Sequence, residues 1–165
     1  MIWMIRCFCL TLQRKNKEQM KETEAYKKLI DHGVRPSFQR IAILNYLLTH
    51  FTHPTVEDVY SALASEIPTL SRTTVYNTLR LLADHHVAQM LTIDDHHLCY
   101  DGNVEPHVHF ICKQCGKVID LFSEQAPQLP QPVIVDGNVI EDKQLFYRGV
   151  CKDCLAKSAD AKVGH

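Results

Sequence analysis

Two short cysteine motifs constrain this chain more than any other feature of its sequence. They are Cys112-Lys113-Gln114-Cys115 and Cys151-Lys152-Asp153-Cys154, and 35 residues separate them. Each C-x-x-C turn brings two thiols together, and two such turns complete the four-thiolate tetrahedron of a closed structural zinc site. The alternative is a redox-active cysteine pair. A redox pair needs only one C-x-x-C motif, whereas this chain has two. We therefore expect Cys112, Cys115, Cys151 and Cys154 to bind a structural Zn²⁺. In a small domain, this ion should supply much of the folding free energy.

The length and the composition of the chain set the context of that site. With 165 residues, the chain can bury one substantial core, or two small ones that need a metal, a disulfide or a partner subunit. No convincing secretory signal precedes the seven cysteines, which favours a reducing, cytoplasmic location. The first twelve residues are apolar, but a bilayer span needs about 20 such residues. We expect residues 1–20 to form an extension, disordered or preceding the true start, and we expect no membrane association.

Capping residues and apolar periodicity predict four helices in the first half. The first covers residues 23–32 and ends at Gly33, and the second begins at Ser37. The third begins at Thr55, where Thr55-Val56-Glu57-Asp58 resembles a capping box, and the fourth covers Ser71–His85. The apolar face of the second helix carries Ile41, Leu44, Leu47 and Leu48.

A hairpin is expected after these helices. Val87–Ile93 and Leu98–Tyr100 are strand-like and flank the polar segment 94–97, which predicts two strands joined by a four-residue loop. Three helices followed by a hairpin make a winged helix, which we place in residues 21–102. Beyond it, residues 107–112, 117–122, 133–137 and 145–150 are strand-like, and prolines at 127, 130 and 132 argue against a long helix among them. The predicted fold class is therefore α+β, with a small sheet domain over residues 103–157 and a tail over 158–165.

The fourth predicted helix has the faces of a DNA-reading helix. Val75, Leu79 and Leu82 fall on one side. The opposite face, which a major groove could accept, carries Thr73, Tyr76, Asn77 and Arg80. The net charge of −1 conceals a gradient, from +3 over residues 1–19 to −4 over residues 91–165, which fits a front end that approaches phosphate. A solvated amphipathic helix is the alternative on this segment alone.

A second set of possible ligands lies just before the first cysteine motif. His107 and His109 alternate along a strand and so point to one face, with Asp101 ahead of them and Asp120 on the next strand. Imidazole and carboxylate together suit Fe, Mn, Co or Zn, unlike the all-thiolate set. The alternative is ordinary surface polarity near a hairpin. His53 joins this set only if the fold brings it there.

Together these residues resemble the Fur (ferric uptake regulator) family, most of all its peroxide-sensing PerR branch, over about residues 21–157. Residues 35–40 (RPSFQR) resemble the R-x-T-x-Q-R motif, residues 53–55 (HPT) the H-P-T/S turn, and residues 74–79 (TVYNTL) the T-V-Y-x-x-L reading helix. Residues 107–117 (HVHFICKQCGK) resemble the specific H-x-H-x-x-C-x-x-C-G-K signature. Two departures stand out: Lys143 replaces a histidine found in many relatives, and the proline-rich stretch 127–132 replaces a helix.

The resemblance implies a homodimeric repressor of double-stranded operator DNA. It implies that residues 103–157 form the dimerisation domain. It also implies a regulatory Fe(II) or Mn(II) site, in which the aspartate at 120 is typical of peroxide sensors. The implied ligands are His53, Asp101, His107, His109 and Asp120.

Two other functions remain open from the sequence. One is an iron- or zinc-responsive uptake regulator that senses metal occupancy alone. The other is a metal-dependent hydrolase, which two histidines and two aspartates could support. We expect no enzyme, because no separate general base or nucleophile accompanies the cluster, and no small-molecule substrate beyond metal and peroxide.

Overall fold

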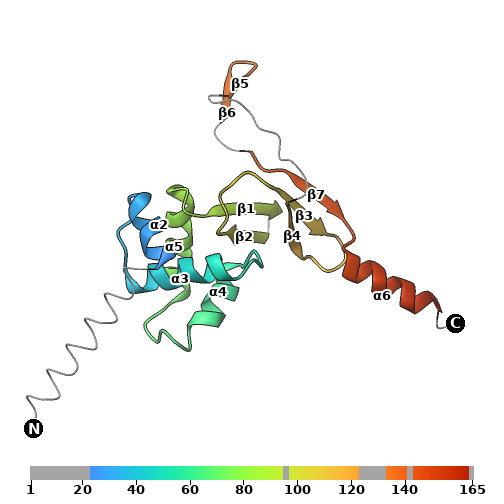
Figure 1. Ribbon diagram of the computed structural model, residues 1–165, viewed down its shortest axis with the longest axis horizontal. Coiled ribbons are helices and arrows are strands. Elements are labelled where there is room, and N and C mark those ends of the chain that lie inside the picture. The colour runs from blue at the N-terminus through green and yellow to red at the C-terminus, as the bar shows by residue number, and fades with distance from the viewer. Residues whose placement is uncertain (1–22, 95–96, 123–132, 141–142, 164–165) are drawn as a thin grey trace, which may run out of the picture. The chain divides into compact units, whose positions relative to one another are not determined.

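The computed structural model describes residues 23–94, 97–122, 133–140 and 143–163 (Figure 1). It divides the chain into two compact units between Val104 and Glu105. The predicted extension over residues 1–20 and the proline-rich stretch 127–132 lie outside the described residues. None of the helices within those described ranges is long and apolar enough to cross a membrane.

The first unit opens with the four predicted helices, all of which are confirmed. They are α2 (Glu24–Asp31), α3 (Phe38–Thr49), α4 (Val56–Leu63) and α5 (Arg72–Asp84). Each begins after a hydroxyl residue whose side chain accepts a backbone N–H of the first turn, which satisfies an otherwise unpaired donor. These N-cap residues are Thr23, Ser37, Thr55 and Ser71. The predicted capping box of α4 is present, with Asp58 accepting from the Thr55 N–H at 2.9 Å.

The core of the first unit lies among these helices. α3 packs against α2, α4 and α5, so its apolar face is wider than a single stripe. Ile43 is buried as well as Ile41, Leu44 and Leu47, whereas Leu48 is only partly buried. The predicted apolar face of α3 is therefore confirmed, with Leu48 packed at the edge of the core and Ile43 as an additional buried residue. From α5, the buried core residues include Val75, Leu79 and Leu82, as predicted.

The predicted hairpin is confirmed, but its strands are longer at the tip than expected. They are β1 (Gln89–Asp94) and β2 (His97–Asp101), and pairing continues to Asp94 opposite His97. The four-residue loop was therefore wrong, because antiparallel backbone pairing does not require apolar side chains. β2 also places Tyr100 in the helical core, fully buried. With α3, α4 and α5 this hairpin completes a winged helix, as predicted.

The second unit contains a three-stranded sheet in the order β4-β3-β7. β3 (Val108–Cys112) pairs antiparallel with β4 (Val118–Leu121) and parallel with β7 (Phe146–Gly149). β5 (Val133–Val135) pairs with β6 (Asn138–Ile140) in a separate hairpin, and α6 covers Lys152–Val163 (Figure 1). All four predicted strand segments are confirmed. The sequence patterns predicted neither β6 nor α6.

Candidate metal centres and nucleic-acid interface

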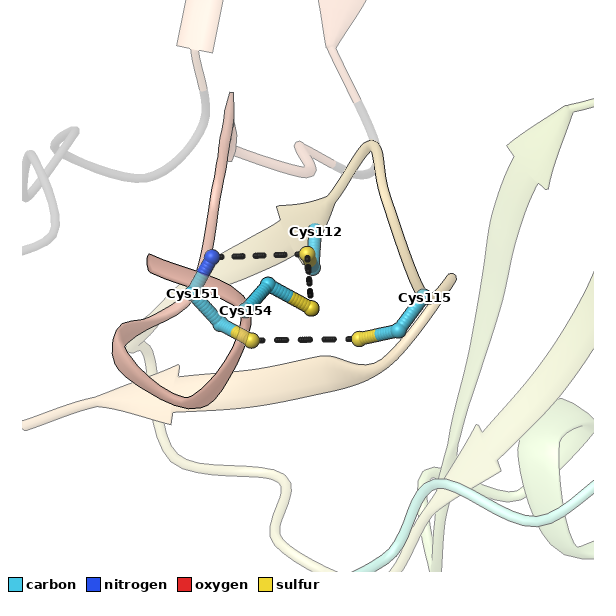
Figure 2. A group of neighbouring side chains, drawn as sticks. All are labelled: Cys112, Cys115, Cys151 and Cys154. Atoms are coloured by element: carbon cyan, nitrogen blue, oxygen red, sulfur yellow. Dashed lines mark hydrogen bonds between the residues drawn. The ribbon is translucent and has the colours of Figure 1, made fainter. Parts of the chain in front are cut away.

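The four cysteines converge in the second unit (Figure 2). Cys112 ends β3, Cys115 lies in the turn after it, Cys151 directly precedes α6, and Cys154 lies in its first turn. The Sγ atoms of Cys112 and Cys154 are 4.0 Å apart, and those of Cys115 and Cys151 are 3.8 Å apart. Sulfurs about 2.3 Å from one tetrahedral zinc lie about 3.8 Å from each other. The donor set and its spacing therefore fit a closed zinc site.

Backbone amides prepare one of these thiols for metal binding. The Cys112 Sγ accepts N–H groups from Cys151 at 3.3 Å and from Gln114 at 3.4 Å. The Cys151 N–H is the main cause that lowers the pKa of the Cys112 thiol to about 6, against the opposing effect of burial. Contact with the Cys151 thiol and burial raise the pKa of Cys154 to about 12. The amides thus favour the thiolate that zinc requires.

Two of the predicted regulatory ligands lie together in the first unit. The loop that holds His53 is tied to β2, because the Tyr100 N–H donates to the Pro54 carbonyl at 3.0 Å. This pairing places the His53 Nε2 4.0 Å from the Asp101 Oδ2, with both side chains buried. The other carboxylate oxygen of Asp101 accepts the Asn103 N–H at 2.9 Å. The carboxylate is therefore oriented by the backbone, with Oδ2 turned toward the imidazole.

The other three predicted ligands lie together in the second unit. The register of β3 with β4 sets His109 opposite Asp120. The Asp120 Oδ1 is 3.2 Å from the His107 Nε2 and 3.6 Å from the His109 Nε2, and all three side chains are almost fully buried. His109 lies in β3 and His107 directly precedes that strand, and their two-residue spacing turns both imidazoles toward Asp120, as the sequence predicted.

The tautomer of His107 bears on what this group can bind. Its Nδ1 lies 2.7 Å from the Glu105 carbonyl, and a carbonyl only accepts hydrogen bonds, so this nitrogen carries the proton. In the neutral ring the Nε2 then carries a lone pair that faces the Asp120 carboxylate. In metal sites, a hydrogen bond from the ring nitrogen that does not bind the metal orients the histidine. Two imidazole nitrogens and a carboxylate oxygen fit a divalent transition metal.

The exposed face of α5 carries the four residues predicted to contact DNA. These four exposed residues are Thr73, Tyr76, Asn77 and Arg80. An ionic contact that was not predicted lies at the start of this helix. Arg72 donates to both carboxylate oxygens of Glu57, at 2.6 and 2.7 Å. No sequence pattern indicated it, because the partners lie on different helices, 15 residues apart.

Known proteins share this chain's combination of sequence and fold. Residues 31–146 match the family described as the ferric uptake regulator family. The chain belongs to that family. It is 39% identical over 136 residues to the peroxide-responsive repressor PerR of Staphylococcus aureus strain USA300, a match that covers 81% of this chain and 91% of that protein.

Solved structures of the family have the same fold. The ferric uptake regulator from Francisella tularensis with iron is 25% identical, with a TM-score of 0.57, over 74% of this chain and 96% of that chain. The ferric uptake regulator from Pseudomonas aeruginosa with manganese is 23% identical, with a TM-score of 0.58, over 79% of this chain and 99% of that chain. The similarity to the Pseudomonas aeruginosa protein shows the fold alone.

Proposed function

We propose that this family member is a metal-dependent repressor of operator DNA that responds to peroxide, and a regulator rather than an enzyme. The observation that carries the proposal is the buried group of His107, His109 and Asp120, in which one aspartate oxygen faces two imidazoles. The similarity to a peroxide-responsive repressor supports it further. We place the protein in the cytoplasm as a homodimer.

Two metals have separate roles in this proposal. Zn²⁺ is structural and is bound by Cys112, Cys115, Cys151 and Cys154. The regulatory Fe(II) or Mn(II) takes the two groups of nitrogen and oxygen donors, namely His53, Asp101, His107, His109 and Asp120. A soft all-sulfur set and a harder nitrogen-oxygen set select different ions, which keeps the two roles apart.

Operator binding is assigned to the exposed face of α5. Asn77 and Arg80 have the side-chain chemistry that reads base edges in a major groove, and Thr73 and Tyr76 carry hydroxyls for bases or phosphates. A twofold-symmetric dimer presents two such helices, which requires a palindromic site with a fixed half-site spacing. The domains proposed are residues 21–102 for DNA binding and residues 103–157 for metal binding and dimerisation, flanked by the extension 1–20 and the tail 158–165.

Peroxide sensing follows from the ligand chemistry. Fe(II) held by these residues would activate peroxide, so that one peroxide oxygen could be added to an imidazole carbon while the other leaves as water; the imidazole is then oxidised and the peroxide reduced. We expect His53 or His107 to gain this oxygen when Fe(II) is bound and to stay intact when Mn(II) is bound. A histidine that gains one oxygen is a poorer ligand, so the protein loses the regulatory metal and releases DNA. The zinc thiolates survive a low dose of peroxide.

The test compares Fe(II)-loaded and Mn(II)-loaded protein after the same low peroxide pulse. Peptide mass spectrometry is run beside binding to a duplex that the wild-type protein selects from a random library. Iron-dependent gain of one oxygen on His53 or His107, with parallel loss of binding, supports the proposal. Undamaged histidines with full binding would leave a regulator of metal occupancy. Asp120→Glu serves as the control, because the longer carboxylate is expected to blunt oxidation and keep metal-dependent binding.

A further inference from the structure

Arg72, the first residue of α5, is fixed more firmly than an ordinary surface arginine. Its Nε donates to the Glu57 Oε2 at 2.6 Å, and its second terminal nitrogen donates to Oε1 at 2.7 Å. The guanidinium carbon also lies 4.1 Å from the centre of the Tyr60 ring. Glu57 and Tyr60 both belong to α4. The two-pronged ion pair and the aromatic ring therefore tie the start of α5 to one face of α4.

These contacts constrain the guanidinium in two independent directions. The paired hydrogen bonds fix it within its own plane, and the Tyr60 ring fixes it perpendicular to that plane. The hydrogen bond from Arg72 lowers the pKa of Glu57, and Glu57 raises the pKa of Arg72, so both groups stay ionised at neutral pH. Both side chains nevertheless remain more than half exposed, at 60% and 57%. Exposed ion pairs contribute little stability, so the consequence of this pair is geometric.

We propose that Glu57 is a positioning residue for DNA recognition, which holds Arg72 so that the exposed face of α5 meets the groove at a fixed angle. The inference rests on the proposed DNA-binding function. An arginine at the start of a reading helix would otherwise bind phosphate. Here its charge is already neutralised by Glu57, and the pair releases no counterion from DNA. Base contacts by Tyr76 and Asn77, which follow Arg72 within the next two turns, depend on the direction of the helix.

The two possible roles of Arg72 predict opposite effects of Glu57→Gln. If Arg72 binds phosphate, loss of the carboxylate frees the guanidinium and removes a negative charge, so every DNA binds more tightly. If Glu57 positions α5, the same change weakens sequence-specific binding. We expect the affinity for the selected duplex to fall about fivefold to tenfold, with no loss on random duplex and an unchanged salt dependence.

The experiment uses the full chain with zinc and Mn(II). Affinities for the selected duplex and for a random duplex are measured at several salt concentrations, with thermal unfolding as a check of folding. Glu66→Gln is the matched control, because Glu66 is an exposed carboxylate in the turn that follows α4 and its loss changes the net charge equally. Glu57→Asp keeps the charge but shortens the reach, and should weaken specific binding as Glu57→Gln does. The swapped pair Glu57→Arg with Arg72→Glu should restore part of the specificity.

Three results would overturn the inference. The first is tighter binding of both duplexes by Glu57→Gln, and the second is unchanged binding of both by that variant. The third is a decrease of about one in the salt dependence of DNA binding by Arg72→Gln, which marks a phosphate contact. Failure of the wild-type protein to select any duplex counts against the proposed function instead, so the two failures are distinguishable.

Discussion

Replacement of Cys112 by serine tests the zinc site most directly. Serine keeps the size of the side chain and can still accept the two backbone N–H groups, but its hydroxyl is a poor zinc ligand at neutral pH. We expect the variant to lose its zinc and the second unit to lose its fold. The four helices of the first unit should remain.

The expected magnitude follows from the small core of the second unit. Among its described residues, the buried aliphatic side chains are Val108, Ile111 and Val118. At about 1.5–3 kcal/mol for each fully buried side chain, they contribute on the order of 5–9 kcal/mol. Structural zinc in small zinc-binding peptides contributes on the order of 10–16 kcal/mol. Loss of the zinc contribution therefore exceeds what these three side chains supply.

The assay combines metal analysis with amide hydrogen exchange. In Cys112→Ser, the amides of β3, β4 and β7 should exchange freely, while those of α3 and α5 keep their protection. Lys113→Ser is the matched control, because Lys113 is exposed in the same turn and offers zinc no thiolate. A Cys112→Ser protein that holds one zinc per chain with unchanged protection in β3 would refute the reasoning.

Three further predictions concern the first unit. Asn77→Ala should cost about 1–3 kcal/mol on the selected duplex and relax preference at one base pair; equal loss on random DNA would contradict base reading. Gly102→Ala would place a Cβ 3.0 Å from the backbone carbon and oxygen of Leu47, and should destabilise this unit by about 1–3 kcal/mol in denaturant unfolding. Because Arg72 lowers the pKa of Glu57, the small stabilisation from this exposed pair is fully present above the ordinary glutamate pKa of about 4.3 and is lost as pH falls through the lower pKa of the folded state. The difference in unfolding midpoint between wild type and Glu57→Gln should therefore be constant from about pH 7 to pH 5 and vanish in more acidic solution.

The features that the sequence predicted are those with local physical causes. Each helix start follows from a hydroxyl side chain that satisfies amides within three residues, as Ser71 does for Thr74 at 3.1 Å. The convergence of two cysteines within one motif follows from the turn itself. The common side of His107 and His109 follows from strand alternation.

The features that the sequence did not predict depend on contacts between distant segments or on weak local signals. Glu57 and Arg72 meet because α4 packs against α5, and residue types alone do not indicate that packing. β6 is only three residues long, and strand pairing through Asp94 and His97 carries no apolar alternation. α6 begins inside the second cysteine motif, directly after Cys151, where the C-x-x-C spacing predicted a turn rather than a helix.

The architecture of β3 implies that the two metals stabilise each other. Its first half carries His109 of the nitrogen-oxygen group, and its last residue is Cys112 of the four-cysteine set. If the second unit is folded only with zinc, the regulatory metal binds only the zinc-containing form, and thermodynamic linkage makes the effect reciprocal. A regulatory metal at 100 times its dissociation constant then stabilises the folded form by about 2.7 kcal/mol, or roughly 100-fold in equilibrium. When Mn(II) is present, removal of the zinc should therefore require a chelator of correspondingly higher zinc affinity or concentration. His109→Ala should abolish that protection and leave the zinc content of the unchallenged protein intact. Equal zinc loss with and without Mn(II) would show that the two sites are thermodynamically independent, in spite of the strand that joins them.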